Sequence, residues 1–289
     1  MSYLIGYAPD RGGADALAVG RMMALAGDVP VTVCVVTPET WGYPSPAAVD
    51  AEYKQFLGEY ARKALARAKA YLGEAVKADY ISVAADSASK GLSRVANEMN
   101  AYLTIVGSAR DGKKMRAGLG STASGVLAGT KCPTLMAPLG YAANAPRVLE
   151  RVTCAFSDDR QGAATLAVAI DLARQHNVPL RLVTFVVRDN QMYPSNVGYD
   201  IENIVANTWR KQAIEVQKAA LAELPSDISG TCAIGDGPDW KRAIASVGWL
   251  WGDILVAGAH HEAGMTAFLF GSTFTRLLRY ASVPIVAVD

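Results

Sequence analysis

The sequence predicts an α/β protein with two tandem doubly wound domains, each built on a parallel five-stranded sheet. Two observations predict this fold: short apolar segments alternate with longer amphipathic segments, and this whole order occurs twice along the 289 residues. Alternating strands and helices favour a parallel sheet with helices on both faces, because right-handed crossovers return each strand in the same direction. Ligands of such sheets bind beyond the carboxyl ends of the strands, where the strand order reverses.

The duplication is visible as an ordered series of matching segments, separated by 149 residues early in the halves and by 151 near their ends. The clearest matches are VPVTVCVVT at 29–37 with VPLRLVTFV at 178–186, Asp10-Arg11 with Asp159-Arg160, and Gly120-Ser121-Thr122 with Gly271-Ser272-Thr273. The segment between 138 and 151 contains small residues and proline, as linkers do. We therefore expect one domain over residues 1–140 and a second over residues 150–289.

Within each half, five apolar segments of strand length follow one another. The expected strands are Tyr3–Ala8, Val31–Thr37, Tyr80–Ala85, Leu103–Gly107 and Thr134–Ala137, then Val152–Phe156, Leu180–Val187, Ile228–Ala233, Ile254–Ala257 and Ile285–Val288. Several are continuous apolar runs, which is typical of strands buried on both faces. The clearest amphipathic helix is expected over Ala51–Val76, where apolar residues recur at spacings of three and four.

Composition narrows the class of protein. The chain is 51% hydrophobic and has a net charge of +1, with basic and acidic residues interspersed. A nucleic-acid partner is not expected, because such proteins carry a basic patch. No uninterrupted apolar stretch reaches about 18 residues, and the first residues do not resemble a signal peptide. We expect a soluble cytoplasmic protein whose four cysteines are reduced thiols.

The loop that follows the fourth strand of each half has the features of a phosphate site. Gly107 ends the strand and Gly120-Ser121 opens the next helix thirteen residues later, and Gly258 and Gly271-Ser272 repeat this spacing. Glycine allows the backbone to approach a ligand closely. A helix N-terminus offers unpaired N–H groups and the positive end of the helix dipole. The alternative is that Gly-Ser-Thr is only a turn and a helix cap.

These residues resemble the universal stress protein family, whose phosphate motif is Gly, two residues, Gly, nine residues, then Gly-Ser or Gly-Thr. The outer positions match in both halves, and the middle glycine is replaced by Arg110 and His261. The acidic residue that commonly follows the first strand in that family is replaced by Ala8 and Ser157, with Asp10 and Asp159 two residues later.

The resemblance covers essentially the whole chain and implies an adenine nucleotide alpha hydrolase-like fold. It implies a regulatory role in stress physiology with ATP, accompanied by Mg, as ligand, and a homodimer formed through the short last strands. AMP and cyclic AMP stay open as alternatives to ATP, and the regulatory protein partner is unknown. The candidate nucleotide-binding residues are Asp10, Gly107, Arg110, Gly120, Ser121, Thr122, Asp159, Gly258, His261, Gly271, Ser272 and Thr273.

Other interpretations of the same segments have less support. Gly107 to Lys113 approaches the P-loop pattern, but the next residue is Lys114 where a P-loop has the hydroxyl that binds Mg²⁺. Adjacent His260 and His261 point apart, so no metal site is expected. No catalytic residue is assigned, and any enzymatic activity is expected to be at most a slow ATPase. The alternative function is a degenerate stress-protein scaffold that binds no nucleotide and acts through protein contacts.

Overall fold

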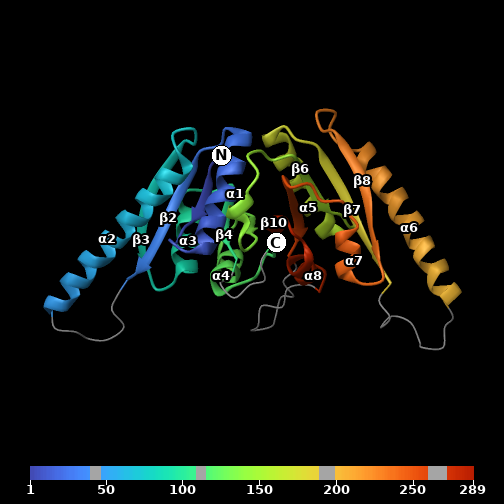
Figure 1. Ribbon diagram of the computed structural model, residues 1–289. Coiled ribbons are helices and arrows are strands. Elements are labelled where there is room, and N and C mark those ends of the chain that lie inside the picture. The colour runs from blue at the N-terminus through green and yellow to red at the C-terminus, as the bar shows by residue number, and fades with distance from the viewer. Residues whose placement is uncertain (40–46, 109–114, 189–198, 260–271) are drawn as a thin grey trace. The chain divides into compact units, whose positions relative to one another are not determined.

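The computed structural model describes residues 1–39, 47–108, 115–188, 199–259 and 272–289 of the chain (Figure 1). Their contacts divide the chain into two compact units, unit 1 from Met1 to Val148 and unit 2 from Leu149 to Asp289. Each unit is an α/β domain in which every strand pairs in parallel with its neighbours. The α/β class and the tandem parallel-sheet architecture predicted from the sequence are therefore confirmed.

Unit 1 is doubly wound. Its sheet has the order β3-β2-β1-β4-β5. The strands are β1 (Tyr3–Gly6), β2 (Val31–Pro38), β3 (Ala78–Ala85), β4 (Leu103–Gly107) and β5 (Thr134–Ala137). The helices are α1 (Arg11–Gly27), α2 (Ala47–Leu72), α3 (Ala88–Glu98) and α4 (Ser121–Gly129), followed by the short 3-10 helix η1 (Tyr141–Asn144). The strand order reverses between β1 and β4, which is where such sheets bind ligands.

Unit 2 repeats this plan. Its sheet has the order β8-β7-β6-β9-β10. The strands are β6 (Arg151–Ala155), β7 (Leu180–Val187), β8 (Gly230–Gly237), β9 (Asp253–Gly258) and β10 (Ile285–Val288). The helices are α5 (Arg160–His176), α6 (Tyr199–Ala222), α7 (Trp240–Ala245) and α8 (Ser272–Tyr280).

Helices cover both faces of each sheet, as Figure 1 shows for each unit. In unit 1, α1 and α2 pack together on one face, and α3 and α4 pack together on the other. In unit 2, α5 and α6 pack on the sheet, and α7 contacts α8. The central strands are fully buried between these layers, which explains why their sequences are continuous apolar runs.

The structure differs from the sequence-based bounds mainly at β8. The strand was expected over Ile228–Ala233, but it runs from Gly230 to Gly237. Two glycines near its end suggest a turn, yet they serve close packing. A Cβ at Gly235 would lie 2.5 Å from the ring of Phe185, and a Cβ at Gly237 would lie 2.5 Å from the backbone of Ala243. Helix α2 begins and ends about one turn before the expected range.

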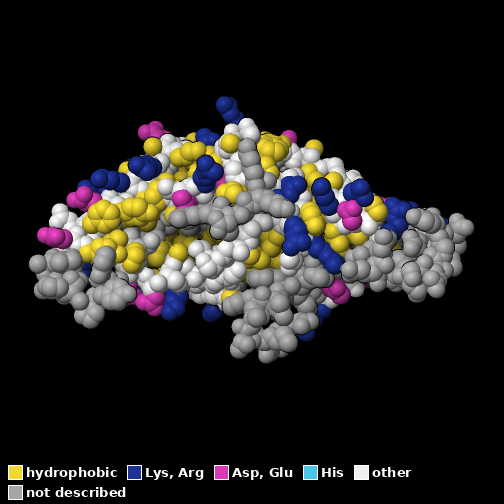
Figure 2. All heavy atoms as spheres, turned by 60° about the horizontal axis from the view of Figure 1, so that its bottom comes forward, with side chains coloured by type: hydrophobic (Ala, Val, Ile, Leu, Met, Phe, Trp, Pro, Cys, Tyr) yellow, Lys and Arg dark blue, Asp and Glu magenta, His cyan; other side chains and the backbone are white. Residues whose placement is uncertain are grey.

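Charged and hydrophobic side chains share the surface. Figure 2 shows Lys and Arg on the same face as Asp and Glu, with hydrophobic side chains between them. No described helix has both the length and the hydrophobicity that a membrane crossing requires.

His176 makes the stability of unit 2 dependent on pH. It is the last residue of α5 and only 3% exposed. Burial lowers the pKa of His176 from 6.5 to about 4. The unfolded chain therefore binds a proton more readily than the native one, and stability is lost as the pH falls from about 6.5 to about 4. We expect this residue to account for a loss of about 3 kcal/mol in unfolding free energy over that range.

The comparison that isolates this effect is between the wild-type chain and a His176→Leu variant. Urea unfolding of both at pH 7 and at about pH 4.5 should give a steeper acid loss for the wild type. Equal losses in the two proteins would show that His176 does not cause the pH dependence.

Candidate functional site

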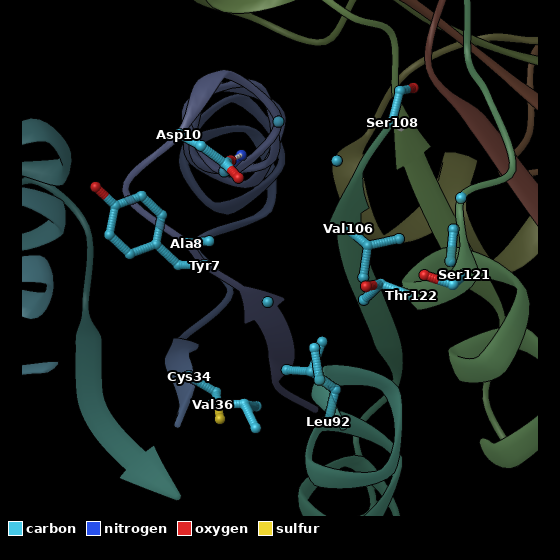
Figure 3. A pocket seen from close by; sticks show the side chains of 17 residues that line it. Tyr7, Ala8, Asp10, Cys34, Val36, Leu92, Val106, Ser108, Ser121 and Thr122 are labelled. Carbon is cyan, nitrogen blue, oxygen red and sulfur yellow. Dashed lines mark hydrogen bonds between the residues drawn. The ribbon is translucent and has the colours of Figure 1, made fainter. Parts of the chain in front are cut away.

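A pocket of about 530 Å³ lies at the carboxyl ends of the central strands of unit 1. Its size is in the range of small-molecule sites. It is lined by residues from the ends of β1, β2 and β4 and from the starts of α1, α3 and α4 (Figure 3). Five residues singled out from the sequence meet in its wall: Asp10, Gly107, Gly120, Ser121 and Thr122. The pocket stands at the reversal of strand order, where the fold class predicts a ligand.

Asp10 caps the N-terminus of α1. Its Oδ1 accepts a hydrogen bond of 2.8 Å from the backbone N–H of Gly13. Gly13 is required for this tight turn, because a Cβ there would lie 1.8 Å from the carbonyl oxygen of Ala8. Figure 3 shows the Asp10 carboxylate turned toward the pocket. The acid therefore both starts the helix and places a hydrogen-bond acceptor in the pocket wall.

Helix α4 begins at the opposite wall without a side-chain cap. Its N-cap residue is Gly120, which has no side chain to accept from the first turn of the helix. The first N–H groups of a helix have no partner within it. Ser121 and Thr122 follow, and Figure 3 shows their hydroxyl groups facing the same space as Asp10. This wall combines N–H donors, hydroxyl groups and the positive end of a helix dipole, which together suit an anion.

Gly107 allows α1 to approach the end of β4. A Cβ at Gly107 would lie 2.0 Å from the carbonyl oxygen of Gly12, so no side chain fits there. A Cβ at Gly12 would in turn lie 3.0 Å from the carbonyl oxygen of Ser108. Because both residues are glycines, the backbone of α1 comes directly against the backbone at the end of β4 at this corner of the pocket.

Ser108 holds the returning loop against the sheet. It is 6% exposed, donates to the carbonyl oxygen of Ala137 and accepts from the N–H of Gly118 at 3.0 Å. Backbone bonds between Met115 and Leu139 and between Leu139 and Arg116 fix the same loop. The residues that lead into α4 are therefore held by hydrogen bonds to the segment that follows β5.

The floor of the pocket is apolar and uncharged. It is formed by Cys34 and Val36 of β2, Leu92 of α3 and Val106 of β4. Burial raises the pKa of the Cys34 thiol to about 12, so the thiol stays protonated at neutral pH. The pKa of Tyr7 is also raised by burial, and Figure 3 shows its hydroxyl pointing away from the pocket. Asp10 is the one acidic side chain among the described lining residues.

In unit 2 the corresponding residues are only partly described. Asp159 caps α5 as Asp10 caps α1, with its Oδ1 accepting from Gly162 N at 2.7 Å. Gly258 ends β9, and Ser272 and Thr273 open α8. Three sequence-based candidates, Arg110 in unit 1 and His261 and Gly271 in unit 2, lie outside the described residues.

Comparisons with known proteins agree with this architecture. A model of the universal stress protein family matches residues 4–138 and 149–289, once for each half. The chain belongs to the universal stress protein family. The universal stress protein Rv2319c of Mycobacterium tuberculosis (strain H37Rv) is 29% identical over 293 residues, covering 100% of this chain and 99% of that protein.

Solved universal stress proteins are similar to this chain. One from Archaeoglobus fulgidus covers 100% of this chain and 98% of its own length, with a TM-score of 0.67 and 15% identity. Another, solved in complex with cAMP, covers 48% of this chain and 98% of its own, with a TM-score of 0.38 and 17% identity. That ligand is a property of that protein.

Several lining residues were not predicted from the sequence, namely Tyr7, Cys34, Val36, Leu92 and Ser108. All of them except Ser108 lie outside the loop from Gly107 to Ser121 that resembles the phosphate motif of universal stress proteins. The signal that could have found Val36 is its place near the end of the second strand, since strand ends line such sites. Among the described residues, no group of three or more His, Cys, Asp or Glu side chains is arranged to hold a metal ion.

Proposed function

We propose that unit 1 binds ATP and that the protein acts as a nucleotide-responsive regulator. The observation that carries the proposal is the pocket between Gly107 and the start of α4, where the helix has no side-chain cap. The backbone N–H groups at Ser121 and Thr122, together with their hydroxyl groups, form the phosphate-binding wall. Mg²⁺ would accompany the phosphates, since it is bound chiefly by phosphate oxygens and water.

The opposite wall suits the nucleoside. The Asp10 carboxylate would repel a phosphate but can accept hydrogen bonds from ribose hydroxyls or an adenine amino group. The apolar floor at Cys34, Val36 and Leu92 suits the flat faces of an adenine ring. Phosphates at α4 and the base near β2 give the ligand one orientation in the pocket. AMP and cyclic AMP share these groups and are the ligands to compare with ATP.

Binding rather than turnover fits the chemistry of the described wall. A hydrolase needs a group that takes a proton near neutral pH. The Cys34 thiol is held protonated by its raised pKa, and Asp10 is engaged in capping α1. Any ATP hydrolysis is therefore expected to be slow.

Calorimetric titration with Mg-ATP tests the proposal. A Ser121→Ala, Thr122→Ala double variant should bind ATP at least roughly tenfold more weakly, because hydrogen bonds to a charged phosphate contribute about 1.5 to 3 kcal/mol. Ser124→Ala is the matched control, since Ser124 lies one turn further along α4 and outside the pocket lining. Its affinity should equal that of the wild type. Equal affinities for all three proteins would contradict the phosphate-binding role of this wall.

Two observations favour the alternative function, a scaffold that binds no nucleotide. Ala8 lies in the pocket wall where the family commonly has an acid, and Phe56 on α2 is 64% exposed. A protein that binds partners through such surfaces would give no heat with ATP, AMP or cyclic AMP.

The expected homodimer and the expected cytoplasmic location stay predictions. Light scattering of the purified chain measures whether it is a dimer.

A further inference from the structure

Unit 2 differs from unit 1 at the positions that make the pocket. In each unit a capping residue stands two positions after the third strand, and the next residue opens a helix. The caps are Ser87 and Asp239, so Ala88 of α3 corresponds to Trp240 of α7. Ala88 lines the pocket of unit 1. An indole in its place needs the space that an alanine leaves for a ligand.

The second strand also carries a larger side chain in unit 2 than in unit 1. Val36 of β2 pairs with Val83, and Phe185 of β7 pairs with Gly235 at the corresponding place in unit 2. The ring of Phe185 lies 5.8 Å from that of Trp240, between centroids. Two aromatic rings therefore lie together where unit 1 has an alanine and a valine.

The Trp240 ring has a second neighbour. The guanidinium carbon of Arg276, on α8, lies 5.1 Å from the centre of the Trp240 ring. A cation over an indole is an attractive contact. Trp240 therefore has a phenyl ring and a guanidinium group as neighbours, both from its own unit, in the region where an adenine ring would have to lie.

A third side chain occupies the corner at the start of α5. Gln161 follows Arg160 as Gly12 follows Arg11, so a long side chain replaces a glycine of the pocket wall. Its Nε2 donates to the carbonyl oxygen of Val288 at 3.2 Å. Its Cγ would lie 2.8 Å from a Cβ built on Gly258. The contact that backbone makes between Gly12 and Gly107 is made by a side chain in unit 2.

We infer that the protein binds one nucleotide per chain, in unit 1, because Gln161, Phe185 and Trp240 fill the corresponding region of unit 2. This inference rests on the proposed nucleotide function of unit 1. It assigns different roles to the two halves: unit 1 binds the ligand, and unit 2 has its own side chains at the corresponding positions. Ala88 is thereby a residue that decides which half binds.

Calorimetry with Mg-ATP on the full chain, with two variants, tests the inference. The wild type should bind one ATP per chain. Ala88→Trp places the residue of unit 2 in the wall of unit 1 and should abolish binding, whereas Trp240→Ala should leave the affinity of the first site unchanged. Two ATP molecules per wild-type chain, or binding that survives Ala88→Trp and is lost in Trp240→Ala, would overturn the inference.

Hydrogen exchange of the wild type locates the site without any substitution. ATP should slow exchange in peptides that contain residues 6–13 and 118–124 and leave peptides around 155–162 and 240–246 unchanged. Protection confined to the unit 2 peptides would overturn the inference while leaving nucleotide binding intact. No binding and no protection anywhere would overturn the proposed function, and this inference with it.

Discussion

Replacing Asp253 with alanine is expected to destabilise unit 2 by about 3 to 5 kcal/mol, because removing one partner of a buried ion pair leaves an uncompensated charge. The Asp253 side chain is fully buried at the start of β9. It accepts from Arg151 Nε at 2.7 Å, from Arg181 at 3.3 Å and from the N–H of Leu250 at 2.9 Å. Burial lowers the pKa of Arg181 to about 10, and the Asp253 carboxylate opposes that shift.

The measurement is urea unfolding followed by tryptophan fluorescence, which reports chiefly on unit 2 because Trp209, Trp240, Trp249 and Trp251 lie there. Asp227→Ala is the matched control. Asp227 also pairs with an arginine, Arg174, at 2.6 Å, but both side chains are about half exposed. Exposed pairs contribute little, so the midpoint should hardly move. Similar losses of unfolding free energy for the two variants would show that the buried Asp253 network stabilises unit 2 no more than an exposed ion pair does.

Gly107→Ala is expected to abolish ATP binding and to destabilise unit 1 by about 1 to 3 kcal/mol, as overpacking of a core does. The added Cβ would lie 2.0 Å from the carbonyl oxygen of Gly12 and 2.4 Å from its carbonyl carbon. Backbone atoms cannot turn aside as a side chain can. The first turn of α1, which carries Asp10 and Gly13 into the pocket wall, would have to move.

Gly258→Ala is the control at the corresponding position in unit 2. There the nearest atoms to the new Cβ belong to the side chains of Gln161 and Thr165 and not to the backbone, so the chain itself does not have to move. We expect unchanged ATP affinity and a smaller loss of stability. Calorimetry and urea unfolding of both variants check this. Equal effects of the two substitutions on ATP binding would contradict the placement of the site in unit 1.

Much of the fold follows from the sequence because the strands are buried on both faces. Continuous apolar runs such as Leu103–Gly107 can hardly form anything else at that length, and β4 has those bounds. The bounds of β8 could not be predicted, because Gly235 and Gly237 resemble a turn locally. Only the approach of Phe185 and Ala243 from other elements shows why a strand needs glycine there.

The site was predictable in part for the same reason. Gly107 and Gly120-Ser121 carry a local signal, spacing within one loop, that can be found without the fold. Cys34 and Leu92 carry none, because ordinary core residues become pocket residues only when sheet order places them beside β4. The contrast between Ala88 and Trp240 requires the two helices to be superimposed by their caps. Their sequences differ too much to be aligned by identity alone.

The central claim is that the pocket of unit 1 holds an adenine nucleotide, and mass spectrometry of nucleotide released from freshly purified protein tests it most directly. The wild-type chain should release ATP or a related adenine nucleotide, and the Gly107→Ala variant purified in parallel should release none. A wild-type protein that carries no nucleotide and gives no heat with ATP, AMP or cyclic AMP would contradict the account.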